Sequence, residues 1–202
     1  DGTFYGMQTF DQALLTHLKA GNISMEEAMK AATSPNDFKL SVAAGGDSSE
    51  PPTPTETTTD CAKGEVWDEK TGACIKAEDS SLNDDQRFGA VRELAYAGRP
   101  DEAMAILAAM TEGETSRVLT YRGFLLRQTG QIEDGIAAYE RAIALDAGNI
   151  LARSYYGQLL VQMNETDLAR LQLAAIRLHG GDGSWAERAL SDAIATGVTY
   201  TY

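Results

Sequence analysis

The stretch that decides the fold is "QTGQIEDGIAAYERAIALDAGN", residues 128–149. One helical pattern ends at Gly130, an alanine-rich helical pattern follows, and after Asn149 the first pattern begins again. Glycine is the residue that most readily takes the positive φ needed to leave a helix. The stretch therefore predicts two helices joined by a tight turn, as one unit of a repeat.

Three copies of this unit can be aligned at a period of about 34 residues, anchored at the turns of Gly98, Gly130 and Asn164. Residues at matched positions are alike: Leu94, Leu126 and Leu160 on the first helices, and Ala103, Gly135 and Ala169 on the second helices. After the third copy, Ser184 and Gly197 bound one more helix as N-cap and stop. The sequence predicts an all-α array of antiparallel helix hairpins closed by a capping helix.

Small residues recur where such helices would cross, at Gly123 and Gly157, and a large aromatic stands at Tyr139. The second copy ends in "ALDAGN". In these features residues 84–181, continued to 197 by the capping helix, resemble tetratricopeptide repeats. The resemblance implies a right-handed solenoid that binds other proteins. Arg87 and Arg153 depart from it, since they stand where the family usually has a large apolar residue.

Two cysteines, Cys61 and Cys74, flank two short extended runs joined by the polar turn "DEKTG". A hairpin would bring the two sulfurs together, and closing a loop of this size stabilises the fold by roughly 3 kcal/mol. We expect a small β-hairpin closed by a disulfide, with a pair of free thiols as the alternative. Two cysteines without neighbouring histidine would leave a zinc site half empty.

The chain divides by composition into four parts, residues 1–43, 44–60, 61–77 and 78–202. Residues 44–60 contain four acids, no base and no large apolar residue, which predicts a disordered linker. Residues 1–43 predict two helices, the second starting with a capping box of Ser24 and Glu27. The remaining parts are the closed hairpin and the helical array.

The first of these parts carries a second resemblance. "GMQTFDQAL" and "SPNDFKL", within residues 6–40, are similar to the carboxyl-terminal tail of twitching-motility (pilus-retraction) ATPases, which are bacterial proteins. The phosphate-binding motif G-x-x-x-x-G-K-[ST] does not occur in the chain. The tail implies the cytoplasm, whereas a disulfide implies a periplasmic or secreted protein. An accessory or regulatory role in a type IV pilus or secretion ATPase system is the alternative function.

Composition excludes several other classes of function. The net charge of −13 repels nucleic acid and anionic lipid surfaces, and no apolar run is long enough for a membrane span. We found no pattern for catalytic, metal or cofactor residues: the sequence predicts no enzyme, no metal site and no cofactor.

Counted from the repeat register, six residues of the first helices were expected to line a groove for a partner: Phe88, Arg92, Arg117, Phe124, Arg127 and Gln158. Arginines and aromatics gathered in an acidic protein predict a site for a peptide with an acidic or carboxylate end. The alternative is that these arginines are solvated or pair with nearby glutamates. The function predicted is a non-enzymatic scaffold for protein–protein interaction.

Overall fold

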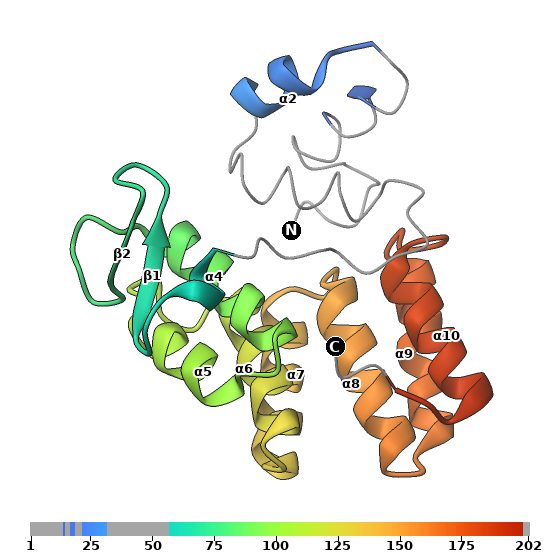
Figure 1. The fold of residues 1–202 in the computed structure, drawn as a ribbon. Coiled ribbons are helices and arrows are strands. Elements are labelled where there is room, and N and C mark those ends of the chain that lie inside the picture. Colours follow the sequence, from blue (N-terminus) through green and yellow to red (C-terminus); the bar gives the residue numbers. More distant parts are fainter. Residues whose placement is uncertain (1–13, 15–16, 19–21, 32–56, 200–202) are drawn as a thin grey trace. The chain divides into compact units, whose positions relative to one another are not determined.

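A computed structural model describes residues 14, 17–18, 22–31 and 57–199 (Figure 1). The chain divides into two compact units, Asp1–Pro52 and Thr53–Tyr202. In the first unit, helix α2 spans Met25–Ala31 and begins with the predicted capping box. Glu27 Oε2 accepts from the Ser24 amide at 2.8 Å, and Ser24 Oγ accepts from the Glu27 amide at 3.2 Å. Most of the other helix predicted for this unit lies outside the described residues.

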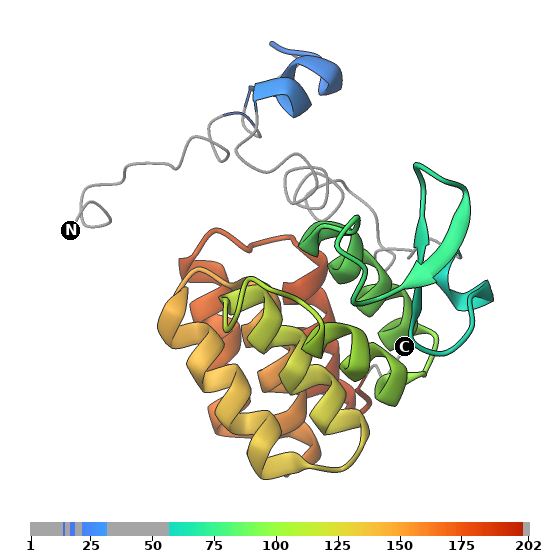
Figure 2. The ribbon, with the colours of Figure 1, turned by 90° about the vertical axis from the view of Figure 1, so that its left-hand side faces the viewer.

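The second unit is built of helix pairs, as predicted (Figures 1 and 2). The first helices are α4 (Asp84–Tyr96), α6 (Ser116–Gln128) and α8 (Ile150–Gln162). The second helices are α5 (Pro100–Ala108), α7 (Ile132–Leu145) and α9 (Thr166–Leu178). Each second helix packs along its own first helix, and α10 (Trp185–Thr196) packs on α8 and α9. None of the helices in the described part is long and apolar enough to cross a membrane.

The turns between paired helices have the backbone conformation that the sequence predicts. Gly98 and Gly130 have φ values of 70° and 79°, and Asn164 has φ 63°. Among the described residues, Asn164 is the single non-glycine residue with a positive φ. The three anchors of the repeat are thus confirmed, and each ends the first helix of its pair.

Two glycines of the first helices allow close helix contacts. A Cβ added at Gly123 would lie 2.8 Å from the ring of Tyr139 on α7, and one added at Gly157 would lie 2.5 Å from a methyl of Leu190 on α10. Such distances leave no room for a side chain. Gly123 therefore sets the approach of a second helix within its repeat, and Gly157 sets the approach of the capping helix.

The predicted β-hairpin precedes the array. Strands β1 (Glu65–Asp68) and β2 (Ala73–Lys76) pair antiparallel, with Trp67 opposite Cys74. A disulfide joins Cys61 to Cys74, with their Cα atoms 5.6 Å apart, so the disulfide is confirmed and the free-thiol alternative is wrong. One detail differs from the prediction, since Cys74 lies within β2 rather than beyond it.

The hairpin shares its interior with the helices. The largest core cluster runs from Val66 of β1, through residues of all three repeats, to Ala189 of α10. Folded structure is also present before residue 61, because a 3-10 helix, η2 (Thr58–Asp60), packs on α4 with Thr58 buried. Residues 57–60, the last of the predicted linker, are therefore part of the fold. The rest of that linker, 44–56, lies outside the described residues.

Candidate functional site

Three tyrosines from the three first helices meet at one point. The hydroxyl of Tyr96 on α4 lies 2.7 Å from that of Tyr121 on α6 and 2.9 Å from that of Tyr155 on α8. Arg92 Nε, also on α4, donates to the Tyr121 hydroxyl at 3.1 Å. Its guanidinium carbon lies 6.0 Å from the centroid of the Tyr96 ring. We call these four residues the tyrosine–arginine cluster.

The charge of this cluster resides on Arg92. Burial, together with Tyr96, raises the pKa of Tyr121 well above its ordinary value, so the phenol remains neutral. Burial opposes the charge of Arg92, but attraction and hydrogen bonding to Tyr121 and Tyr96 outweigh it and raise the pKa of the guanidinium. The result is a permanent, half-buried positive charge held among neutral hydroxyl groups.

Arg92 differs from most other arginines of the array in its partners. Arg87, Arg99 and Arg117 each bind a carboxylate, at 2.6–2.9 Å. Arg122, Arg141, Arg170 and Arg177 do so as well. Within the described part of the chain, Arg92 has no carboxylate partner, and its hydrogen bond to Tyr121 uses Nε alone. The two terminal nitrogens of its guanidinium are therefore available to an acceptor outside the described residues.

The structure corrects the predicted groove at four of its six residues. Phe88 and Phe124 are core side chains, Gln158 is fully buried, and Arg127 is 7% exposed. Arg127 Nε donates to Gln162 at 2.9 Å and Nη1 lies 3.5 Å from the carbonyl oxygen of Tyr155. The register misplaced them because a first helix in an array packs against its own second helix and against first helices on its flanks.

Arg117, the fifth predicted residue, follows the alternative of pairing with nearby acids. It bonds to Asp85 at 2.8 Å and to Glu112 at 2.6 Å. Its guanidinium carbon lies 4.9 Å from the centroid of the Phe88 ring. Arg117 therefore joins α4 to the start of α6, and Arg92 is the predicted residue whose surroundings still fit a ligand.

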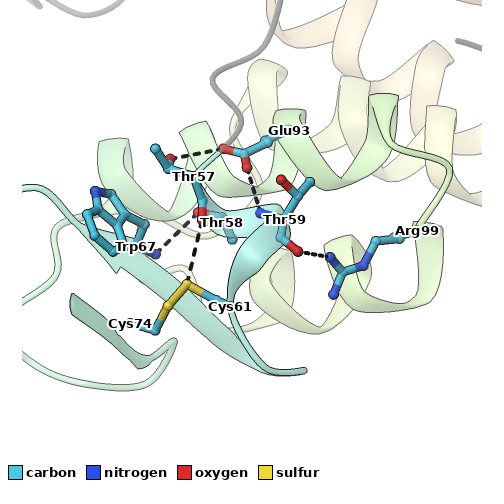
Figure 3. The surroundings of a disulfide bond; sticks show 8 residues. All are labelled: Thr57, Thr58, Thr59, Cys61, Trp67, Cys74, Glu93 and Arg99. Carbon is cyan, nitrogen blue, oxygen red and sulfur yellow. Dashed lines mark hydrogen bonds between the residues drawn. A yellow bond between two sulfur atoms is a disulfide. The ribbon is translucent and has the colours of Figure 1, made fainter. Parts of the chain in front are cut away.

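The hairpin is fastened to α4 by a second polar cluster (Figure 3). Buried Glu93 accepts from the Thr59 amide at 2.6 Å and from the Thr57 hydroxyl at 3.3 Å. Arg99 donates to the Thr59 carbonyl at 2.7 Å, and Thr58 Oγ1 accepts from the Trp67 amide at 3.2 Å. These donors and acceptors bind one another within the fold. We therefore assign the cluster a structural role.

The sequence analysis missed the three tyrosines, although it contained a signal for two of them. Tyr121 and Tyr155 occupy the same position of the second and third copies, nine residues before Gly130 and Asn164. Tyr96 has no counterpart at its position, and its meeting with the other two depends on how the three first helices are stacked. Within the described residues, no three His, Cys, Asp or Glu side chains are grouped as metal ligands would be.

Comparison with known families gives one match, in which residues 126–193 fit the tetratricopeptide repeat profile. This segment, from the end of α6 into α10, consists of tetratricopeptide repeats, a class that generally mediates protein–protein interaction and is typically non-catalytic. No curated protein and no solved structure matched the chain. The comparisons gave no support to the resemblance of residues 6–40 to pilus-retraction ATPases.

Proposed function

We propose that the protein is a non-enzymatic scaffold whose first helices bind an extended peptide that carries a carboxylate, with Arg92 as the binding residue. Support comes from the tetratricopeptide repeats of residues 126–193 and from the partners of Arg92. Arg153 also has no carboxylate partner among the described residues, but its terminal nitrogens bond to Gln172 and to the Ala147 carbonyl, whereas Arg92 bonds through Nε to a tyrosine hydroxyl. A guanidinium can bind a carboxylate through two parallel hydrogen bonds, which gives both affinity and orientation.

The tyrosines fix the geometry of that contact. Tyr121 holds Nε of Arg92, and the ring of Tyr96 lies beside the guanidinium plane, so the side chain is pre-organised before a ligand arrives. Pre-organisation lowers the entropy lost on binding. The disulfide fits an oxidising compartment, which supports the proposal that the protein works in the periplasm or outside the cell.

A peptide library tests this proposal with the full chain. Synthetic octapeptides with a free carboxyl terminus and the same peptides amidated would be compared for binding by fluorescence anisotropy. We expect the carboxylate set to bind more tightly and the preference to fall as salt rises. Arg92→Ala should weaken binding of the carboxylate set about tenfold or more, and Arg92→Lys should restore part of it.

Arg122→Ala is the matched control, because Arg122 lies on α6, pairs with Glu114 and has a side chain 36% exposed. It should leave binding unchanged. Equal binding of the two peptide sets, or full binding by Arg92→Ala, would contradict a role for Arg92. Urea unfolding of each variant shows that the compared proteins are equally folded.

A further inference from the structure

The outer face of α9 carries an apolar stripe that the other second helices lack. Leu168, Leu171 and Leu178 are 46%, 63% and 82% exposed, and half-buried Ala175 lies between them at helical spacing. Spacings of three, four and three residues put all four side chains on one side of the helix. Exposed large apolar side chains in such a row mark an interaction surface.

The matching positions of the other two copies show whether the fold needs leucine on this face. At the positions that match Leu168, Leu171 and Leu178, the second copy has Asp134, Ala137 and Ala144, all exposed. The first copy has Glu102 and Ala105 at the first two of these positions. The fold therefore forms with acid and alanine on this face, and the leucines of the third copy are not needed for its packing.

The net charge of the second helices also distinguishes α9 from α5 and α7. α7 carries Glu133, Asp134 and Glu140 against one base, Arg141, and α5 carries Asp101 and Glu102 without a base. α9 carries Asp167 against Arg170 and Arg177. Its balance is one positive charge, whereas that of α7 is two negative charges. Two copies of this acidic protein can therefore approach at α9 with less repulsion than at α5 or α7.

We propose that α9 is a homodimer interface in which the helices of two copies pack antiparallel. A two-fold axis near the middle of the helix sets Leu168 against Leu178 of the second copy, and Leu171 against Ala175 of the second copy. The same axis brings exposed Asp167 toward His179 of the second copy, and the two helix dipoles oppose each other. The stripe is small, so the dimer is reversible, with a dissociation constant on the order of 10–100 µM.

Sedimentation equilibrium of the full chain tests the dimer. The mass of the wild type should rise from monomer toward dimer over that concentration range. The variant Leu168→Asp, Leu171→Ala, Leu178→Ala, which copies the residues of α7, should remain a monomer up to about ten times the dissociation constant. Leu145→Ala, at a 57% exposed leucine of α7, is the matched control and should dimerise as the wild type does.

Cross-linking locates the interface independently. Both native cysteines form the disulfide, so one introduced cysteine is the only reactive thiol. Ala174→Cys on α9 should give a covalent dimer with a short bis-maleimide, and exposed Ala144→Cys on α7 should not. A wild type that stays monomeric, a triple variant that still dimerises, or cross-linking at both positions alike would overturn the proposal.

Discussion

At the N-terminal end of the array, η2 and the hairpin cover α4. The buried carboxylate of Glu93 and the guanidinium of Arg99 bind Thr59 of η2, and the disulfide ties η2 to the hairpin. At the C-terminal end, α10 covers α8 and α9. Its buried residues Leu190 and Ala193 belong to a second apolar core cluster, separate from the one that contains Val66. Both ends solve the same problem, since an outermost helix would otherwise expose its apolar face. The N-terminal end adds a disulfide and buried polar contacts to its apolar packing, and the C-terminal end depends mainly on close packing.

The difference shows how the two ends can fail. A packed end is weakened by removing volume, because the core relaxes only partly around a cavity. A polar end is weakened by removing a cross-link or a charge, because its donors and acceptors then remain buried without their partners. Three substitutions or treatments, ordered by expected effect, test this contrast.

Leu190→Ala should lower the free energy of unfolding most, by about 4 kcal/mol, because the side chain is fully buried over Gly157. Urea denaturation measures this loss. Adding Gly157→Ala should recover part of it, since the new methyl group occupies space that Leu190 filled. Ile194→Ala, at a half-buried residue of α10, is the control and should cost about 1 kcal/mol. If adding Gly157→Ala makes Leu190→Ala less stable, close packing does not explain this end.

Reduction of the disulfide should destabilise the opposite end by about 3 kcal/mol, because the unfolded loop is no longer closed. Hydrogen exchange should then rise in η2, the hairpin and α4 and remain unchanged in α10. The double variant Cys61→Ala, Cys74→Ala should not respond to reductant. Faster exchange in α10 on reduction would mean that the two ends are not independent.

Asp84→Asn should have the smallest effect, about 1.5 kcal/mol near pH 7. Although burial acts to raise the pKa of Asp84, bonds from Thr111, Glu112 and Arg87 outweigh it and hold the pKa below its usual value. A lowered pKa in the folded state stabilises the protein above the unfolded pKa of about 3.9, and this stabilisation is lost as pH falls through the lower folded pKa.

Unfolding measured from pH 7 down to about pH 2 follows this loss. The difference in stability between wild type and Asp84→Asn should shrink as the pH falls below about 4. Asp192→Asn, at an exposed residue of α10, is the control and should change stability by less than about 0.5 kcal/mol. A difference that stays constant over the whole range would show that the charge of Asp84 does not contribute.

Local chemistry in the sequence was enough for the turns within the helix pairs and for the closing helix. Gly98, Gly130 and Asn164 predicted the turns because few residues adopt positive φ, and Ser184 and Gly197 predicted the limits of α10. The spacing of Cys61 and Cys74 predicted the disulfide through the polar turn between them. In each case the signal and the structure it specifies lie within a few residues of each other.

The candidate site was predictable only in part. Arg92 stays a predicted binding residue, whereas Phe88, Phe124, Arg127 and Gln158 were predicted to line a groove and are buried. The helical period predicts which residues lie on the same side of one helix. It does not predict how many sides of that helix are buried by neighbouring helices. Tyr121, which accepts the hydrogen bond from Arg92, lies 29 residues along the chain, and Tyr155 of the same cluster lies 59 residues from Tyr96.

The sequence by itself determined the helix pairs, their turns, the closing helix and the disulfide, because each depends on backbone conformation or short spacing. Tertiary structure alone decided that Arg87 makes a buried bond to the Ala77 carbonyl, that Glu93 holds η2, and that Arg92 joins three tyrosines in one cluster. Burial is a property of the assembled layers. It appears only when helices distant in the chain are placed against one another.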